Sequence, residues 1–322
     1  MKSIGGFFDL ELPPAGPGPH PGAVALSTGR ACMGLWIQDA QPERCYVPFY
    51  CCDALIQPLQ EAGIPFEFYS IDEQLCPKEL PEEPGNDEWL VWTNFFGLLG
   101  NRLEPLSKAW GGRILVDNTH AFFEAFEPKL WSFTSARKYF GVPDGAYCYR
   151  PDGDATEPDV ERFVPDSACH LVARYTRKSG EAFSMYQEAE EALDCSLKRI
   201  SKLSEKLMSG VDIESARMAR HRNYEILVEH LSKYNTFSLA NCAPVKTPFC
   251  YPFLPAKPIA RHNLYKKNIF VPTLWSDVEN REVDDFELER RISRDLLPLP
   301  IDHRYKPNDM LRLASIVLDN IW

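Results

Sequence analysis

The sequence lacks the cysteine spacing of a disulfide framework or of a zinc site. It contains ten cysteines among 322 residues, but no Cys-x-x-Cys pair occurs, and Cys51 and Cys52 are adjacent. Structural zinc sites need clustered ligands, and disulfide frameworks are typical of short secreted chains. We therefore expect no metal site, and we expect reduced thiols that act as small apolar side chains in a cytoplasmic protein.

The sequence also lacks a long apolar run and an excess of positive charge. No run of about 18 apolar residues is present, so we expect no membrane span. Prolines interrupt the segment 1–22, which does not resemble a signal peptide. The formal net charge of -11 argues against a nucleic-acid groove, which needs a basic face. A phosphate-bearing ligand is compatible with this charge, because backbone N–H groups at a helix start bind phosphate.

The composition and the order of patterns predict an α/β protein. Hydrophobic residues make up 44% of the chain, so a sizeable core is available. After a Pro/Gly-rich lead-in, short apolar segments alternate with helical patterns. The expected strands are 45–50, 65–71, 88–93, 113–116 and 130–133, and the expected helices are 31–37, 53–62 and 106–110. Such alternation predicts a mostly parallel sheet covered by helices, with ligands bound at the carboxyl ends of the strands.

A more helical pattern follows Pro165. Apolar residues recur at spacings of three and four up to Gly210, which predicts one long helix over 181–208. Asp212 is expected to cap a second helix that reaches about Lys233. The residues expected to face inward from this helix are Met218, Tyr224, Leu227, Val228 and Leu231.

The last segment, 236–322, is expected to form a smaller α+β unit. A strand is predicted at 268–271, and helices are predicted near 284–296 and 307–320. We therefore divide the chain into a large, mostly parallel α/β domain, 1–210, and a small C-terminal α+β domain, 211–322.

The stretch from 113 to 149 carries the most specific chemical signal. An apolar strand ends in Asp117, and a second strand leads to Lys138 in a loop that closes on Gly145. Pyridoxal phosphate (PLP) chemistry needs such a pair, because a lysine forms a Schiff base with the aldehyde and a carboxylate keeps a proton on the ring nitrogen. Because the lysine must give up its proton to attack, we expect Lys138 to be buried beside Arg137. Taken singly, Lys138 is compatible with a surface lysine and Asp117 with a strand-end carboxylate.

Further candidates lie at the same predicted strand ends. His120 could stack on a cofactor ring or donate to its phenolic oxygen, although a lone histidine is also compatible with a structural role. The segment Thr28-Gly29-Arg30 opens a predicted helix and is a candidate phosphate cradle. Ser132 and Ser135 could each add a hydroxyl group to the phosphate.

These motifs together resemble the DegT/StrS-type sugar aminotransferases, a family of fold type I PLP-dependent enzymes. The resemblance extends over roughly 23–150 and rests on five motifs. These are STGRAC (27–32), YVPFY (46–50), NFFG (94–97), DNTH (117–120) and SFTSARKYFGVPDGAY (132–147).

The resemblance implies a role for each candidate. Lys138 would be the catalytic Schiff-base lysine, Asp117 the partner of the ring nitrogen, and His120 a contact of the ring. Residues expected around the phosphate are Thr28, Gly29, Arg30, and Ser132 or Ser135. Many members place an aromatic residue over the ring where this chain has Cys52, so stacking is left to Tyr50, to His120 or to no residue. The residues expected to contact the substrate are Asn94 and Phe96.

The resemblance also implies an activity. The expected reaction moves an amino group from an amino acid, with glutamate as the expected donor, to a keto-sugar nucleotide in surface-polysaccharide or secondary-metabolite synthesis. The enzyme would be a cytoplasmic homodimer with no nucleic-acid or membrane partner. Relatives that dehydrate their substrate replace the lysine with histidine, so Lys138 favours transamination. Two alternatives stay open: PLP chemistry on a non-sugar substrate, and a catalytically silent binding or regulatory protein.

Overall fold

The computed structural model describes residues 8, 10–12, 16–82, 84–165, 168–176, 179–241 and 246–321. Its centre is a seven-stranded sheet in the order β1-β7-β6-β5-β4-β2-β3. The strands are β1 (Val24–Leu26), β2 (Arg44–Pro48), β3 (Phe66–Tyr69), β4 (Glu88–Thr93), β5 (Ile114–Asp117), β6 (Trp131–Ser135) and β7 (Ala146–Tyr149). All neighbouring pairs from β3 to β6 are parallel, whereas β7 is antiparallel to both β6 and β1. This confirms the predicted mostly parallel sheet; the antiparallel strand β7 was not predicted.

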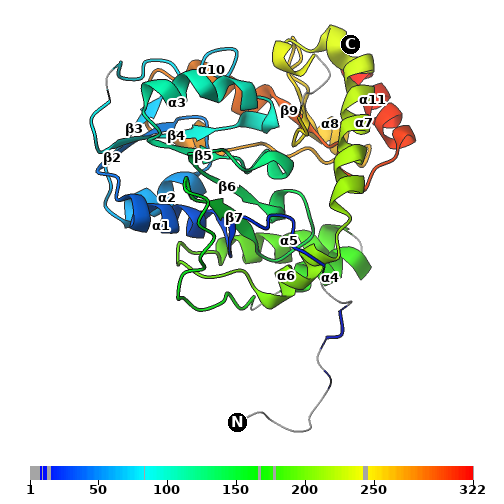
Figure 1. Ribbon diagram of the computed structural model, residues 1–322. Coiled ribbons are helices and arrows are strands. Elements are labelled where there is room, and N and C mark those ends of the chain that lie inside the picture. Colours follow the sequence, from blue (N-terminus) through cyan, green and yellow to red (C-terminus); the bar gives the residue numbers. More distant parts are fainter. Residues whose placement is uncertain are drawn as a thin grey trace.

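Helices cover both faces of the sheet, as the predicted α/β architecture requires (Figure 1). Helices α1 (Gly29–Ala40) and α2 (Asp53–Glu61) lie on one face, and α3 (Leu103–Ala109) and α10 (Glu287–Asp295) lie on the other. The α1–α2 face buries residues such as Trp36, Leu115 and Phe133 in one core. The opposite face shares a larger core with the C-terminal part of the chain. Both faces of the sheet are therefore shielded from water, which explains why the strand sequences are almost continuously apolar.

The remaining elements lie beside this layered unit (Figure 1). They are α4 (Cys169–Thr176), α5 (Ser179–Glu191), α6 (Lys202–Ser209), α7 (Ile213–Leu231), α8 (Arg261–Tyr265), α9 (Asp277–Asn280), α11 (Pro307–Leu318) and the antiparallel pair β8 (Tyr251–Phe253) and β9 (Leu297–Leu299). The long helix α7 packs against α11, and its start is capped by Asp212, as predicted.

The single helix predicted over 181–208 is wrong. The chain leaves α5 at Glu191 and runs extended to Ser201, whose side chain caps α6. In between, Ile200 donates its N–H to the Ala25 carbonyl, and Arg199 bridges to β1. Because β1 is an edge strand, its unpaired backbone groups attract this segment, and that pairing replaces the helical hydrogen bonds.

Two predictions in the C-terminal part are also wrong. Residues 268–271 form no strand, because Asn268 has a left-handed φ of 58° and closes the turn after α8. Met218 is 54% exposed rather than inward, although Tyr224, Leu227 and Leu231 are buried as expected. The helices predicted near 284–296 and 307–320 are confirmed as α10 and α11.

No helix in the described part of the chain is long and apolar enough to cross a membrane.

A buried histidine at the base of the sheet predicts acid sensitivity. His20 shares a 2.7 Å hydrogen bond between its Nδ1 and the Tyr149 hydroxyl, and burial lowers its pKa from 6.5 to about 4. The unfolded chain takes up a proton as the pH falls through 6.5, but the folded chain does not until about pH 4. Stability is therefore lost as the pH falls below 6.5. Between pH 7 and pH 5, we expect this group to remove about 2 kcal/mol from the free energy of unfolding.

Urea unfolding of the wild type and of His20→Gln at pH 7 and pH 5 measures this loss. The glutamine amide keeps a partner for Tyr149 but has no titrating proton, so the variant should lose less stability on acidification. Equal losses in the two proteins would refute the assignment to His20.

Candidate active site

The carboxyl ends of the parallel strands bring the predicted candidates to one edge of the sheet. Because β1 runs in the same direction as β6, the start of α1 also lies at this edge. Asp117 is the last residue of β5 and pairs in register with Thr93 and Phe133. Lys138 ends the short 3-10 helix η4 (Ala136–Lys138), directly after β6.

Asp117 is buried at this edge, with 7% of its surface exposed. Burial raises its pKa, whereas hydrogen bonds from Thr119 and the positive charge of Lys138 oppose that rise. One carboxylate oxygen accepts the Thr119 N–H at 2.9 Å, which fixes the orientation of the side chain. A carboxylate has about four acceptor sites, so Asp117 can accept a further hydrogen bond from a positively charged group in addition to its bonds from Thr119.

Lys138 lies within electrostatic reach of three candidate residues. Its positive charge acts on Asp117, on His120 and on Cys52, and in each case it lowers the pKa of that group. The expectation that Lys138 is buried is wrong: the side chain is exposed, and Arg137 turns away to form an ion pair with Glu190. The ammonium group is therefore open to a small molecule that approaches this edge.

His120 is held by contacts on its ring faces and on one edge. Phe249 stacks on it at 4.3 Å between ring centroids, and Trp275 stacks at 5.3 Å, both within 12° of parallel. Its Nδ1 accepts the Phe96 N–H at 3.3 Å, which assigns the proton of the neutral ring to Nε2. Burial, together with Lys138, holds the pKa of His120 well below its ordinary value, so the ring stays neutral.

The Nε2 atom of His120 is buried and has no hydrogen-bond partner among the described residues. Since two rings of the same chain already stack on the imidazole, the structure favours the predicted hydrogen bond from its edge over the predicted stacking on a ligand ring. An unpartnered buried donor is costly unless a ligand supplies the acceptor.

The start of α1 has the features predicted for a phosphate cradle. Thr28 caps the helix, with its side chain accepting the Ala31 N–H at 3.1 Å. The free N–H groups of the first turn, which include those of Gly29 and Arg30, point out of the helix start. Arg30 itself donates to Gln57 on α2, so its guanidinium is directed along the protein surface.

The two predicted serines lie on opposite faces of β6. Phe133 packs in the α1–α2 core, and the alternation of side chains along a strand places Ser135 on that same face and Ser132 on the other. Ser132 therefore faces away from α1, and its prediction as a phosphate ligand is wrong. Ser135 lies at the strand end, where its hydroxyl is 3.4 Å from the Gly145 carbonyl oxygen.

Gly145 joins this serine to the start of α1. Its N–H donates to the Ser27 carbonyl at 2.6 Å, and its carbonyl accepts the Ala136 N–H at 3.0 Å. The residue has a φ of 125°, which favours glycine. The loop after Lys138 is therefore fastened to the phosphate-cradle side of the edge.

Two other predicted contacts have mainly internal roles. Tyr50 is completely buried, with its ring against Phe95 and Trp275, which leaves no face for a ligand ring. Asn94 is also completely buried and uses its amide to hold Asn118 and the Leu99 N–H. The structure thus gives Tyr50 no stacking role and gives Asn94 no open polar group for a substrate.

Phe96 is the last of the predicted contacts. It is buried and acts through its backbone N–H, which holds His120. Cys52, which stands where many relatives have an aromatic residue, is half-buried, packs against the α1–α2 core and lies within electrostatic reach of Lys138 and Asp117.

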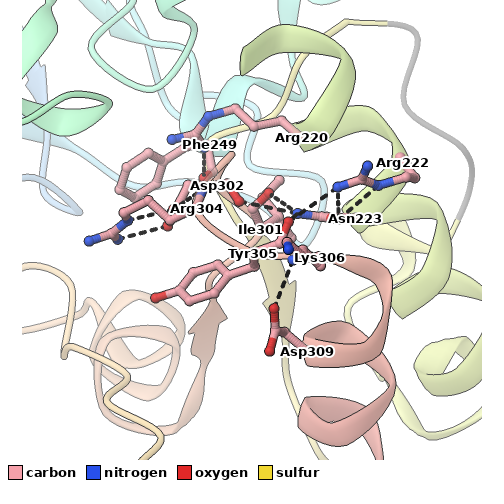
Figure 2. A network of polar contacts seen from close by, with 10 residues as sticks. All are labelled: Arg220, Arg222, Asn223, Phe249, Ile301, Asp302, Arg304, Tyr305, Lys306 and Asp309. Carbon is pink, nitrogen blue, oxygen red and sulfur yellow. Dashed lines mark hydrogen bonds and ion pairs between the residues drawn. The ribbon is translucent and has the colours of Figure 1, made fainter. Parts of the chain in front are cut away.

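Contacts from the C-terminal part were not predicted from the sequence. Arg220 on α7 is buried, donates to the Phe249 carbonyl at 2.8 Å, and lies over the ring of Tyr139, the neighbour of Lys138, at 4.3 Å. Figure 2 shows this arginine beside Asp302, which forms an ion pair with Arg304. The network holds Phe249 in position behind His120. Arg220 lies four residues before Tyr224, on the helical stripe that buries Tyr224 and Leu227, so the spacing indicates its burial; no local pattern indicates its contact with Phe249.

Metal binding has no support in the described residues, where no group of three His, Cys, Asp or Glu side chains has suitable geometry. An open depression lined by Trp131, Arg150 and three aspartates lies where β6 begins, at the opposite edge of the sheet, and is separate from the Lys138 cluster.

Comparison with known proteins identifies the fold. No family model matches the chain, and no curated protein is significantly similar in sequence. Among solved structures, DesI with its TDP-sugar product has a TM-score of 0.63 at 14% identity, with 93% of this chain and 80% of DesI covered. A DegT DnrJ EryC1 StrS aminotransferase from Brucella abortus gives 0.61 at 13%, covering 92% of this chain and 85% of that protein. The GDP-4-keto-6-deoxy-D-mannose-3-dehydratase of E. coli, solved with hydrated PLP, gives 0.62 at 16%, covering 91% and 87%.

At these identities the likeness establishes the architecture. The chain has the fold of PLP-dependent enzymes of fold type I, and the resemblance found in the sequence is confirmed at the level of the fold.

Proposed function

We propose that this protein is a PLP-dependent aminotransferase that moves an amino group from an amino acid to a keto-sugar nucleotide. The observation that carries the proposal is the position of Lys138, an exposed amine whose charge acts on both Asp117 and His120 at the carboxyl edge of the sheet. Ligands of open α/β sheets bind at this edge.

The described residues fit PLP at both of its ends. The unpartnered Nε2 of His120 is a donor for the phenolic oxygen, and the Asp117 carboxylate, which can accept more than its bonds from Thr119, is an acceptor for a protonated ring nitrogen. The start of α1, from Thr28 to Arg30, and the Ser135 hydroxyl are suited to the phosphate dianion. The fit is thus one of complementary donors and acceptors.

Bound PLP supplies an electron sink for the charge that develops when a proton leaves the substrate carbon. The chain supplies the remaining functions. Lys138 would provide the amine that holds the cofactor, and its free Nζ would accept the proton of the substrate carbon and return it to the acceptor carbon. Asp117 would keep a proton on the ring nitrogen, and His120 would orient the phenolic edge.

The substrates follow from the family resemblance and from the neighbours. DesI was solved with a TDP-sugar product, and GDP-4-keto-6-deoxymannose-3-dehydratase with a PLP-glutamate geminal diamine. Glutamate as donor and a keto-sugar nucleotide as acceptor are therefore our first choices for this chain. A cytoplasmic homodimer in surface-polysaccharide or secondary-metabolite synthesis, with domains 1–210 and 211–322, belongs to the same proposal. Dehydration is the second candidate because two neighbouring structures are of GDP-4-keto-6-deoxymannose-3-dehydratase, and Lys138 favours transamination over it.

The test is reductive trapping of the cofactor. Purified protein with added PLP should show the visible absorption band of a lysine-bound cofactor. Borohydride should reduce the imine that joins the cofactor to Lys138 to a secondary amine, and peptide mapping should find the pyridoxyl group on Lys138. Lys108→Ala removes an exposed lysine paired with Glu104 and should leave the band unchanged, whereas Lys138→Ala should abolish it. Absence of the band, or an adduct on another lysine, would overturn the proposal.

Transfer to a sugar is tested separately with a panel of nucleotide-linked keto sugars and labelled glutamate. Trapping at Lys138 without transfer to any keto sugar would favour PLP chemistry on a non-sugar substrate. Trapping without any spectral change on addition of amino donors would favour a silent binding protein.

A further inference from the structure

We propose that Trp275 is a positioning residue for His120: its indole stacks on the imidazole and keeps the Nε2–H directed to the candidate cofactor site. This inference rests on the proposed function, because the role of His120 does. Trp275 lies far along the chain from His120, in the loop before α9, and it reaches the site from the C-terminal part.

The contacts of Trp275 are specific to the candidate site. Its ring lies 5.3 Å from that of His120 with an angle of 12°, and it meets Tyr50 edge-on at 4.5 Å. It also contacts Phe95 at 5.6 Å in the turn after β4. The indole thus packs against the segments that follow β2, β4 and β5. Movement of the indole would therefore free the His120 imidazole to reorient.

The backbone of Trp275 is held in an unfavourable conformation. Its φ is 55°, in the left-handed region that bulky side chains rarely adopt. Its carbonyl oxygen lies 3.0 Å from the hydroxyl of Ser293 on α10 and also accepts the Val278 N–H at 3.1 Å. Strain of this kind persists only where the surroundings over-determine it, and such positions concentrate at functional sites.

The loop that carries Trp275 is fastened to the edge of the sheet. Arg281, just past α9, donates to the carbonyl oxygens of Phe49 and Cys51 and forms an ion pair with Asp53 at 2.7 Å. The Asp277 carboxylate accepts the Asp53 N–H at 3.0 Å. The indole therefore has a fixed position relative to the segment that bears Cys52, and it transmits that position to His120.

The experiment compares Trp275→Ala and Trp275→Phe with Trp89→Ala, a control that loses a half-buried indole packed against Trp36 instead of His120. The readouts are the dissociation constant for PLP and the pH midpoint of its visible absorption change. Without Trp275, His120 should lose its hydrogen bond to the phenolic oxygen of PLP, which disfavours the charged form of that oxygen. Trp275→Ala should therefore raise the pH midpoint of the absorption change by about one pH unit and weaken PLP binding about tenfold. Trp275→Phe should restore most of both values, and Trp89→Ala should change neither.

A double-mutant cycle with His120→Phe shows whether the effect passes through His120. If it does, Trp275→Ala should add no further shift in the His120→Phe background. Thermal unfolding of each variant verifies that it folds, and Trp275→Leu, which keeps apolar volume but has no ring to stack on His120, takes the place of Trp275→Ala if the alanine variant does not fold. Unchanged midpoint and affinity in folded Trp275→Ala, or additive shifts in the cycle, would overturn this inference while leaving the proposed function intact. Absence of PLP binding by the wild type would overturn both.

Discussion

Replacement of Asp117 by asparagine is expected to reduce turnover on the order of 100-fold to 1000-fold while the cofactor stays attached to Lys138. The asparagine oxygen can still accept the Thr119 N–H, so the turn after β5 should be retained. The negative charge is lost, and with it the group that keeps a proton on the ring nitrogen. Loss of one preorganised electrostatic partner of a developing charge has an effect of this size.

The control for this variant is Glu289→Gln. Glu289 on α10 is also buried and accepts the Ile71 N–H at 2.7 Å, but it does not lie in the Lys138 cluster. Turnover should be measured in both variants with the absorption of the bound cofactor recorded at the same time. Wild-type turnover in Asp117→Asn, or an equal loss in Glu289→Gln, would contradict the role assigned to Asp117.

Replacement of Gly97 by alanine is expected to destabilise the protein by roughly 3 kcal/mol. Gly97 has a φ of 74°, and an added Cβ would collide with the His120 carbonyl oxygen and approach the Thr247 carbonyl oxygen at 3.3 Å. Both neighbours are backbone atoms, which cannot rotate away. The turn that carries the Phe96 N–H would therefore have to move away from His120.

Gly63→Ala separates the cost of a side chain at positive φ from the cost of the collision with the His120 carbonyl oxygen. Gly63 has nearly the same conformation, with a φ of 68°, but nothing lies within 4 Å of an added Cβ. Gly63→Ala should lower the free energy of unfolding only by the strain of a side chain at positive φ, about 1 kcal/mol. The free energy of unfolding in urea gives both values, and similar losses at the two positions would show that the close approach to His120 is unimportant.

Much of the sheet and the main chemical pair could be predicted from the sequence because both depend on local pattern. A strand and the residue that ends it are adjacent in sequence, so Asp117 and Lys138 could be assigned to one edge before the structure was known. The wrong predictions occur where the local conformation is determined by contact with a segment far along the chain. The apolar spacing at 181–208 is compatible with a helix, but pairing with β1 draws part of it into an extended form.

Local sequence is also insufficient to predict every residue of the candidate site. The wrong assignment of Ser132 comes from strand alternation, since one residue separates the face that carries α1 from the opposite face. Trp275 and Phe249 reach His120 only because the C-terminal part packs there. Their sequence neighbourhoods contain no motif that would indicate it.

The placement of β1 has a consequence for the order in which the chain folds. Leu26 pairs with Ala146, and β1 leads directly into α1, so the helix start cannot be fixed in place until β7 has formed. During synthesis the first strand emerges early and waits for a late partner, which is a non-local and therefore slow contact. Segment 198–200 adds its bridge to β1 later still. The phosphate end of the site would then mature only after residues 198–200 are in place, although it begins near the start of the chain, and conditions that stall the chain before β7 should leave β1 exposed to misfolding.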